Sequence, residues 1–119
     1  MKIIRGEIYY ADLGKKAVGS EQTGIRPVVI VQNNVGNEYS PTVIVAPITS
    51  KVNTKAKLPT HVFLKGSKIR IPLDSIILLE QITVIDKSRL KEILGVLDYQ
   101  ETKEMDKALA VSLGINIAY

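Results

Sequence analysis

Arg26 is the side chain best placed to bind a phosphate, because it stands between a polar stretch and an apolar run. The polar stretch, 19–24, is bracketed by glycines, and the run 28–31 is β-branched throughout. Pro27 disfavours helical backbone at Arg26, and β-branched runs are typical of interior strands, so Arg26 should lie where a strand meets a loop. The planar guanidinium matches phosphate geometry. A surface arginine that only flanks a strand explains the position equally well.

Thr49 ends a second apolar run, 42–49, and Pro47 stands two residues before it. Since proline lacks an amide donor, Pro47 should lie at a sheet edge or a bulge. From the residues alone, the simpler explanation of Thr49 is β-propensity at a strand end, with no chemical role.

Few side chains are available to carry protons. His61 is the single histidine, so a mechanism with two histidines in one subunit is excluded, and a lone histidine at a strand start is more often packed or hydrogen-bonded. Glu21 and Glu80 are the carboxylates nearest to Arg26 and Thr49, and either could orient Arg26 or accept a proton. As ordinary surface acids they need neither role, and this explanation is favoured for Glu80.

Composition limits the class of protein. With 119 residues, of which 45% are hydrophobic, the chain should form one compact domain. The absence of cysteine excludes disulfides and thiolate nucleophiles, and with one histidine it disfavours a zinc site. A net charge of +4 is typical of proteins that bind nucleic acid, although composition alone is weak support. No signal-peptide core or membrane-length apolar run is present, so a soluble, cytoplasmic protein is expected.

The apolar pattern predicts a mainly β fold. Strands are predicted at 7–13, 26–32, 42–49, 61–64, 75–79 and 82–85, with loops at 14–25 and 50–59. Turn-forming residues occupy 33–37, and a hairpin turn at 65–68 should lead into a half-exposed strand through Ile69 and Ile71. Residues 87–97 are ambiguous, and a helix should begin at Asp98 with a capping box to Glu101. Many short strands and one terminal helix predict a small barrel.

Several motifs, taken in order, resemble those of the MazF/PemK family of toxin endoribonucleases. They are "RGEIYYADL", "GSEQTGIRPVVIVQN", "SPTVIVAPIT", "LPTHV", "DSIILLEQI" and "MDKALAVSLGI". The resemblance covers nearly the whole chain. It implies one domain, 1–119, with the SH3-like barrel of the MazF/PemK/CcdB type and a C-terminal helix, and it favours a strand in the later part of 87–97.

The resemblance also implies an activity: metal-independent cleavage of single-stranded RNA, mainly mRNA, at a short sequence, without a cofactor. The products would be a 2′,3′-cyclic phosphate and a 5′-hydroxyl. The "GIRP" and "PIT" motifs place the catalytic residues at Arg26 and Thr49. The RNA-binding residues would be Ser20, Glu21, Gln22, Lys57 and Gln81, since polar loop groups read exposed base edges and lysines attract phosphates.

The implied partners are a second copy of the chain in a homodimer and a MazE-like antitoxin with an acidic tail. Two other functions remain open. A gyrase-poisoning toxin of the same fold should depend on residues 116–119, whereas a non-catalytic RNA-binding barrel should show salt-sensitive binding without cleavage.

Overall fold

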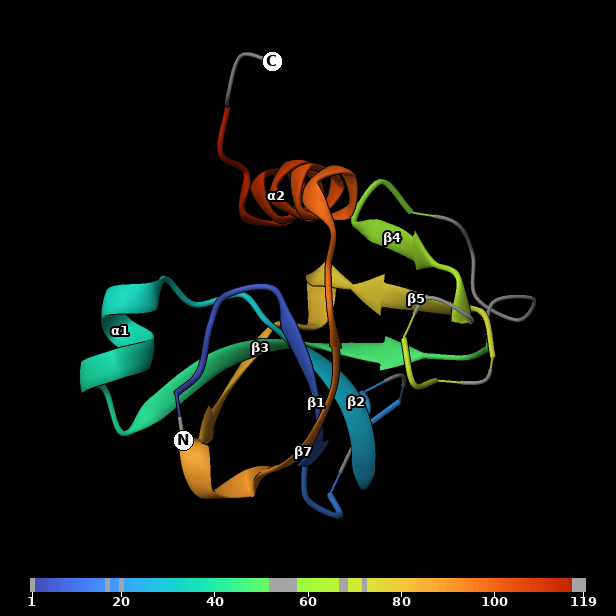
Figure 1. The fold of residues 1–119 in the computed structure, drawn as a ribbon. Coiled ribbons are helices and arrows are strands. Elements are labelled where there is room, and N and C mark those ends of the chain that lie inside the picture. The colour runs from blue at the N-terminus through green and yellow to red at the C-terminus, as the bar shows by residue number, and fades with distance from the viewer. Residues whose placement is uncertain are drawn as a thin grey trace.

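The structure, a computed structural model, describes residues 2–16, 18–19, 21–51, 58–66, 69–71 and 73–116 (Figure 1). Its strands form an antiparallel sheet in the order β4-β5-β3-β2-β1-β7, with β6 paired to β3. The elements are β1 (Glu7–Asp12), β2 (Ile25–Ile30), α1 (Asn34–Tyr39), β3 (Thr42–Thr49), β4 (His61–Leu64), β5 (Ser75–Leu78), η2 (Leu79–Gln81), β6 (Thr83–Asp86), η3 (Lys87–Arg89), β7 (Leu90–Val96) and α2 (Tyr99–Leu113). The predicted mainly β fold with a terminal helix is confirmed.

Strand β3 is the centre of the sheet, because it pairs with three other strands. Its first half pairs with β6, its middle with β2, and its last two residues with β5. The last five residues, 45–49, are all buried. A strand that is covered on both faces needs apolar residues at successive positions, which accounts for the apolar run in the sequence. Thr49 therefore lies where the sheet passes from β2 to β5.

Two apolar clusters fill the fold, one on each side of the central strands. Val29 and Met105 belong to the cluster beneath α2, while the neighbouring Val28 packs with Tyr9 and Val45 in the other cluster. This alternation follows from the two-residue period of a strand. Because Val28, Val29 and Ile30 are all buried, the second half of β2 is fixed by packing as well as by hydrogen bonds.

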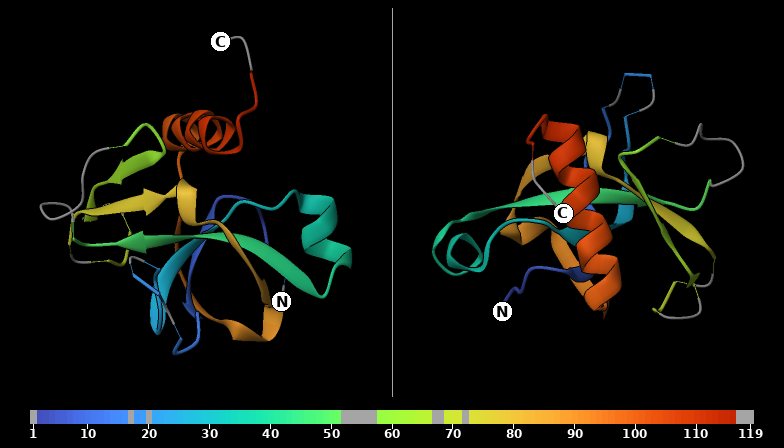
Figure 2. Two further views of the ribbon diagram at one scale, coloured as in Figure 1. Left: turned by 180° about the vertical axis from the view of Figure 1, so that it is seen from behind. Right: turned by 90° about the horizontal axis from the view of Figure 1, so that it is seen from above.

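Helix α2 lies over one side of the sheet, and α1 and the β4–β5 pair lie at opposite sides of the molecule (Figures 1 and 2). Asp98 caps α2 in the predicted capping box with Glu101, and Gly114 ends the helix with a φ of 71°. Met105 and Ala108 are buried on the inner face of the helix, and α2 packs chiefly on β4 and η2. No helix in the described part of the chain is long and apolar enough to cross a membrane.

Two local predictions were wrong. Residues 33–37, predicted as a turn, begin helix α1, because the Asn33 side chain accepts a hydrogen bond from the Gly36 amide and caps the helix. The strand predicted through Ile69 and Ile71 is absent from the described residues, and β4 pairs instead with β5. The Arg70 amide donates to the Leu94 carbonyl, 3.0 Å away, so this segment lies against β7.

Other boundaries differ less. Leu79, predicted in a strand, begins the short helix η2, and the ambiguous segment 87–97 consists of η3 followed by β7. The strand that the resemblance favoured in its later part is thus confirmed. Residues 67 and 68 of the predicted hairpin turn lie outside the described residues.

Candidate functional site

Arg26 lies near the start of β2, directly opposite Ala11 of β1. Its side chain is half-buried, and its Nε donates a hydrogen bond to the Thr23 carbonyl, 2.6 Å away. A guanidinium carries five N–H donors. Within the described residues no carboxylate pairs with Arg26, and no acceptor binds its other N–H groups. The side chain is therefore held on one side while its remaining donors stay available to an anion.

Thr49 ends β3, the strand that neighbours β2. Val28 pairs with Pro47, the last pair of the β2–β3 ladder, so Arg26 and Thr49 each lie two residues beyond that pair. Thr49 is only 1% exposed, and its Oγ1 accepts a hydrogen bond from the Lys51 amide over 3.2 Å. Its hydroxyl proton is left to donate. The two predicted catalytic residues therefore lie on neighbouring strands, just beyond the paired part of the ladder, with Thr49 beneath the surface.

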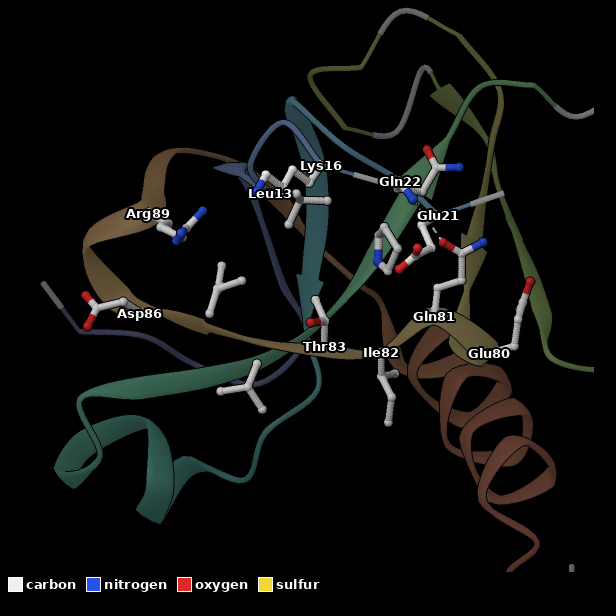
Figure 3. Close-up of a pocket in the computed structure, with 13 residues that line it drawn as sticks. Leu13, Lys16, Glu21, Gln22, Glu80, Gln81, Ile82, Thr83, Asp86 and Arg89 are labelled. Carbon is white, nitrogen blue, oxygen red and sulfur yellow. Dashed lines mark hydrogen bonds between the residues drawn. The ribbon is translucent and has the colours of Figure 1, made fainter. Parts of the chain in front are cut away.

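A groove of about 690 Å³ reaches Pro47 of β3 and Gln22 of the β1–β2 connection (Figure 3). Its walls come from the β1–β2 connection, from β3 through Pro47, and from the segment that joins η2 to η3. Figure 3 shows Glu21, Gln22 and Gln81 at one end, and Asp86 and Arg89 at the other. The lining residues are Leu13, Lys16, Glu21, Gln22, Pro47, Glu80, Gln81, Ile82, Thr83, Val84, Ile85, Asp86 and Arg89. Arg26 and Thr49 are not lining residues. Two lining residues are near them in the sequence: Gln22 precedes Arg26 by four positions, and Pro47 precedes Thr49 by two.

Gln22 and Gln81, both predicted to bind RNA, are joined by a hydrogen bond. The Gln22 amide donates to Oε1 of Gln81 over 3.2 Å, which links the β1–β2 connection to η2. Oε1 of Gln22 is buried and accepts no hydrogen bond from any described residue. A buried acceptor without a donor costs roughly 1–3 kcal/mol, so a ligand N–H at this point would be stabilising.

Glu21 is exposed and does not contact Arg26. Its Oε1 accepts a hydrogen bond from the Val18 amide at 2.7 Å, within its own loop. The carboxylate therefore does not orient Arg26. Ser20 and Lys57, the other two predicted RNA-binding residues, lie outside the described residues.

Glu80 is bound by two side chains of the turn that enters β4. Oε1 accepts from Oγ1 of Thr60 at 2.9 Å, and Oε2 lies 3.0 Å from Nε2 of His61. Burial raises the pKa of Glu80, but hydrogen bonds from its own backbone, from His61 and from Thr60 outweigh burial and hold the pKa below the usual 4.5. Glu80 is thus an ionised acceptor that does not orient Arg26, and His61 is hydrogen-bonded, as predicted.

Nδ1 of His61 accepts a hydrogen bond from the Leu58 amide, 3.4 Å away. This leaves Nε2 as the donor to Glu80 when the ring is neutral. Among the described residues, no three histidine, aspartate or glutamate side chains are grouped so that they could hold a metal ion.

Sequence reasoning missed the far end of the groove. Arg89 donates a hydrogen bond to the Asp12 carbonyl at 3.1 Å, which ties η3 to the end of β1, and Lys16, Thr83 and Asp86 also line the walls. No short-range signal marks these residues, because they meet only once β6 has paired with β3. The basic charge of Lys16 and Arg89 suits the phosphates of a nucleic acid.

Comparison with known proteins identifies relatives over nearly the full length. Residues 4–113 match the family described as "PemK-like, MazF-like toxin of type II toxin-antitoxin system". An "Endoribonuclease MazF" of Staphylococcus saprophyticus is 56% identical over 112 residues, which cover 94% of this chain and 92% of the relative.

Solved structures agree with the fold. An endoribonuclease from Mycobacterial species, in complex with its cognate antitoxin, is 28% identical and superposes with a TM-score of 0.78, covering 98% of this chain and 99% of that one. A MazF from Deinococcus radiodurans, 22% identical, reaches a TM-score of 0.78 over 96% of this chain and 98% of its own, and supports the fold alone. The predicted fold type and enzyme class are confirmed, and the chain belongs to the PemK-like, MazF-like family of toxins of type II toxin–antitoxin systems.

Proposed function

We propose that this chain is a sequence-specific endoribonuclease that cleaves single-stranded RNA, mainly mRNA, without a metal ion. The observation that carries the proposal is the state of the Arg26 side chain, which is half-buried near the start of β2 and has N–H donors to which no described residue binds. The 56% identity to an endoribonuclease supports the same activity.

The proposed reaction uses the RNA's own 2′-hydroxyl as the nucleophile. Its oxygen attacks the adjacent phosphorus and loses its proton, while the bond to the 5′-oxygen breaks and that oxygen gains a proton. The products are a 2′,3′-cyclic phosphate and a 5′-hydroxyl. Arg26 binds the phosphate and stabilises the negative charge that develops on its oxygens.

Thr49 contributes a hydrogen bond from its hydroxyl to a phosphate oxygen or to the departing 5′-oxygen. Since Thr49 is 1% exposed, the side chains that cover it must move when RNA enters. The catalytic arrangement is therefore completed only when RNA binds.

RNA recognition is assigned to the end of the groove that carries Glu21, Gln22 and Gln81, together with Ser20 and Lys57. The unpaired Oε1 of Gln22 can accept a hydrogen bond from an exocyclic amino group of a base. With six aromatic residues in the chain (five tyrosines and one phenylalanine), recognition should depend more on hydrogen bonds than on stacking.

The proposed partners are a second copy of this chain, in a homodimer, and a MazE-like antitoxin. The mycobacterial structure that superposes on this chain contains an endoribonuclease with its cognate antitoxin, which supports an antitoxin here. A disordered acidic tail on the antitoxin would complement the net charge of +4 and would compete with RNA for the groove. The proposed location of the pair is the cytoplasm.

The test is cleavage of a long, defined RNA in EDTA by wild type, Arg26→Ala and Thr49→Val, with mapping of the fragment ends. Lys103→Ala is the control, since it removes one positive charge from α2, outside the groove. Discrete cuts with 5′-hydroxyl ends should be lost in the two site variants and kept in the control. A folded wild type that binds RNA but never cuts it would support the non-catalytic barrel instead.

A further inference from the structure

Thr60, His61 and Glu80, here called the Glu80 cluster, form a hydrogen-bonded group that the cleavage reaction does not use. Both carboxylate oxygens of Glu80 are engaged, Oε1 by Thr60 and Oε2 by His61. A carboxylate whose two oxygens already accept hydrogen bonds is a weak proton acceptor, and the lowered pKa of Glu80 agrees with this. The cluster therefore needs a role other than general-base catalysis.

The cluster fixes η2 against the turn that enters β4. The Leu79 amide donates to the Thr60 carbonyl at 3.0 Å, and His61 pairs with Leu78 in the β4–β5 ladder. On the other side, Oγ of Ser112 in α2 donates to the Leu79 carbonyl at 2.9 Å. Glu80 adds the side-chain bonds that hold the exposed face of η2, next to the groove.

The residue that follows Glu80 makes the link to the recognition loop. Gln81 accepts the hydrogen bond from the Gln22 amide, and the two residues are 59 positions apart in the chain. A continuous path of hydrogen bonds and one peptide bond thus runs from β4 through Glu80 and Gln81 to the connection that leads into Arg26. Any rotation of η2 would move the Gln81 acceptor away from Gln22.

We propose that Glu80 is a positioning residue for RNA recognition, which acts by holding Gln81 and, through it, the loop that carries Gln22. This inference rests on the proposed function. Glu80 does not touch the reacting phosphate, so its loss should weaken RNA binding and base discrimination and leave the chemical step close to that of wild type.

The expected effects follow from the bonds removed. Glu80→Ala removes both acceptors and loosens Gln81, and we expect KM to rise about tenfold, the size expected when one hydrogen bond to RNA is weakened. Glu80→Gln keeps the shape of the side chain and one oxygen acceptor. Its amide NH2 replaces the other oxygen and faces either Thr60 or His61, which both donate to Glu80 in wild type. The KM of Glu80→Gln should therefore lie between those of wild type and Glu80→Ala. Base preference should relax in the same order.

The kinetic test measures kcat and KM on a short RNA and on variants of it that differ by one base at a time. Glu92→Gln, an exposed change on β7 outside the groove, is the matched control and should behave as wild type. Thr60→Val removes the donor to Oε1 without altering Glu80. In the double variant with Glu80→Ala, it should raise KM little beyond the value for Glu80→Ala alone, because both changes remove the same contact. Unchanged KM and base preference in folded Glu80→Ala, or a fall in kcat at constant KM, would overturn the proposal.

A second measurement decides the inference even if wild type does not cleave RNA. Hydrogen exchange of the Gln22 amide, followed by NMR in RNA-free protein, should be slow in wild type and Glu92→Gln, because Gln81 accepts this hydrogen bond. It should be faster in Glu80→Ala and in Thr60→Val. Equal exchange in all four proteins would contradict the positioning role, whereas inactive wild type with the expected exchange pattern would contradict only the proposed cleavage.

Discussion

The two halves of the candidate site are held in place by different kinds of hydrogen bonds. Arg26 and Thr49 lie on β2 and β3, which a backbone ladder joins from Val28 onward, and Val28 is fully buried. Gln22 and Gln81 are joined by a bond between a backbone amide and a side chain. A backbone ladder survives most single substitutions, but a bond to a side chain does not, so catalysis and recognition should respond separately to mutation.

The largest effect is expected at Arg26. Arg26→Ala should lower the single-turnover cleavage rate about 10²–10³-fold, the cost typical of losing one electrostatic donor to the transition state. Arg26→Lys should recover only part of the rate, because an ammonium keeps the charge but loses the planar donor fork. The cleavage pattern should stay that of wild type. An alanine variant that cuts RNA at the wild-type rate would remove Arg26 from the mechanism.

Thr49 should show the next largest effect. Thr49→Val keeps the shape but lacks the hydroxyl, and it should slow cleavage about 10- to 100-fold, the range for a hydrogen bond to a charged group. Thr49→Ser should cut faster than Thr49→Val. Rapid-quench kinetics measure both. Equal rates for the two variants would mean that the hydroxyl donates nothing in the transition state.

Substitutions at the end of the groove that carries Gln22 and Gln81 should affect RNA binding more than the cleavage rate. We expect Gln22→Ala or Gln81→Ala to raise KM about tenfold and to relax the choice of one base, because each removes groups that would read a base edge. Sequencing the 5′ ends of fragments from a random RNA pool measures this directly. If kcat falls and the cleavage sites stay the same, the division between the two halves is wrong.

The smallest effect concerns acid stability at the Glu80 cluster. The pKa of Glu80 is below its usual 4.5, so its ionised form stabilises the folded state above the unfolded pKa, and this contribution is lost as pH falls through the folded pKa. The stability difference between wild type and Glu80→Gln should therefore be present at pH 7 and shrink below about pH 4.5. Urea midpoints at each pH test this, and a difference that grows in acid would contradict the assigned direction.

The strands that carry Arg26 and Thr49 could be predicted because their signals are local. The β-branched run after Arg26 and the apolar run before Thr49 each indicate a buried strand without reference to the rest of the chain. The family resemblance then added the chemical roles, which the residues alone left undecided. In particular, β-propensity alone was the simpler explanation of Thr49 until the resemblance gave it a chemical role.

The groove and the Glu80 cluster could not be predicted because they depend on long-range pairing. Thr60 and Glu80 meet only because the chain between β4 and β5 returns β5 alongside β4, and the sequence favoured a returning strand at Ile69 and Ile71 instead. Arg89 reaches the end of β1 only after β6 has paired with β3. Such contacts are set by register, which short-range patterns do not specify.

The most direct test of the account measures single-turnover cleavage of two RNAs, one with the preferred site and one with a single base changed in it. Arg26→Ala should slow both reactions by the same factor and keep the ratio of the two rates. Gln81→Ala should reduce that ratio and leave the rate at saturating RNA near that of wild type. If Arg26→Ala cleaves as fast as wild type, or alters the ratio while Gln81→Ala does not, catalysis and recognition are not divided between Arg26 and Gln81 as proposed.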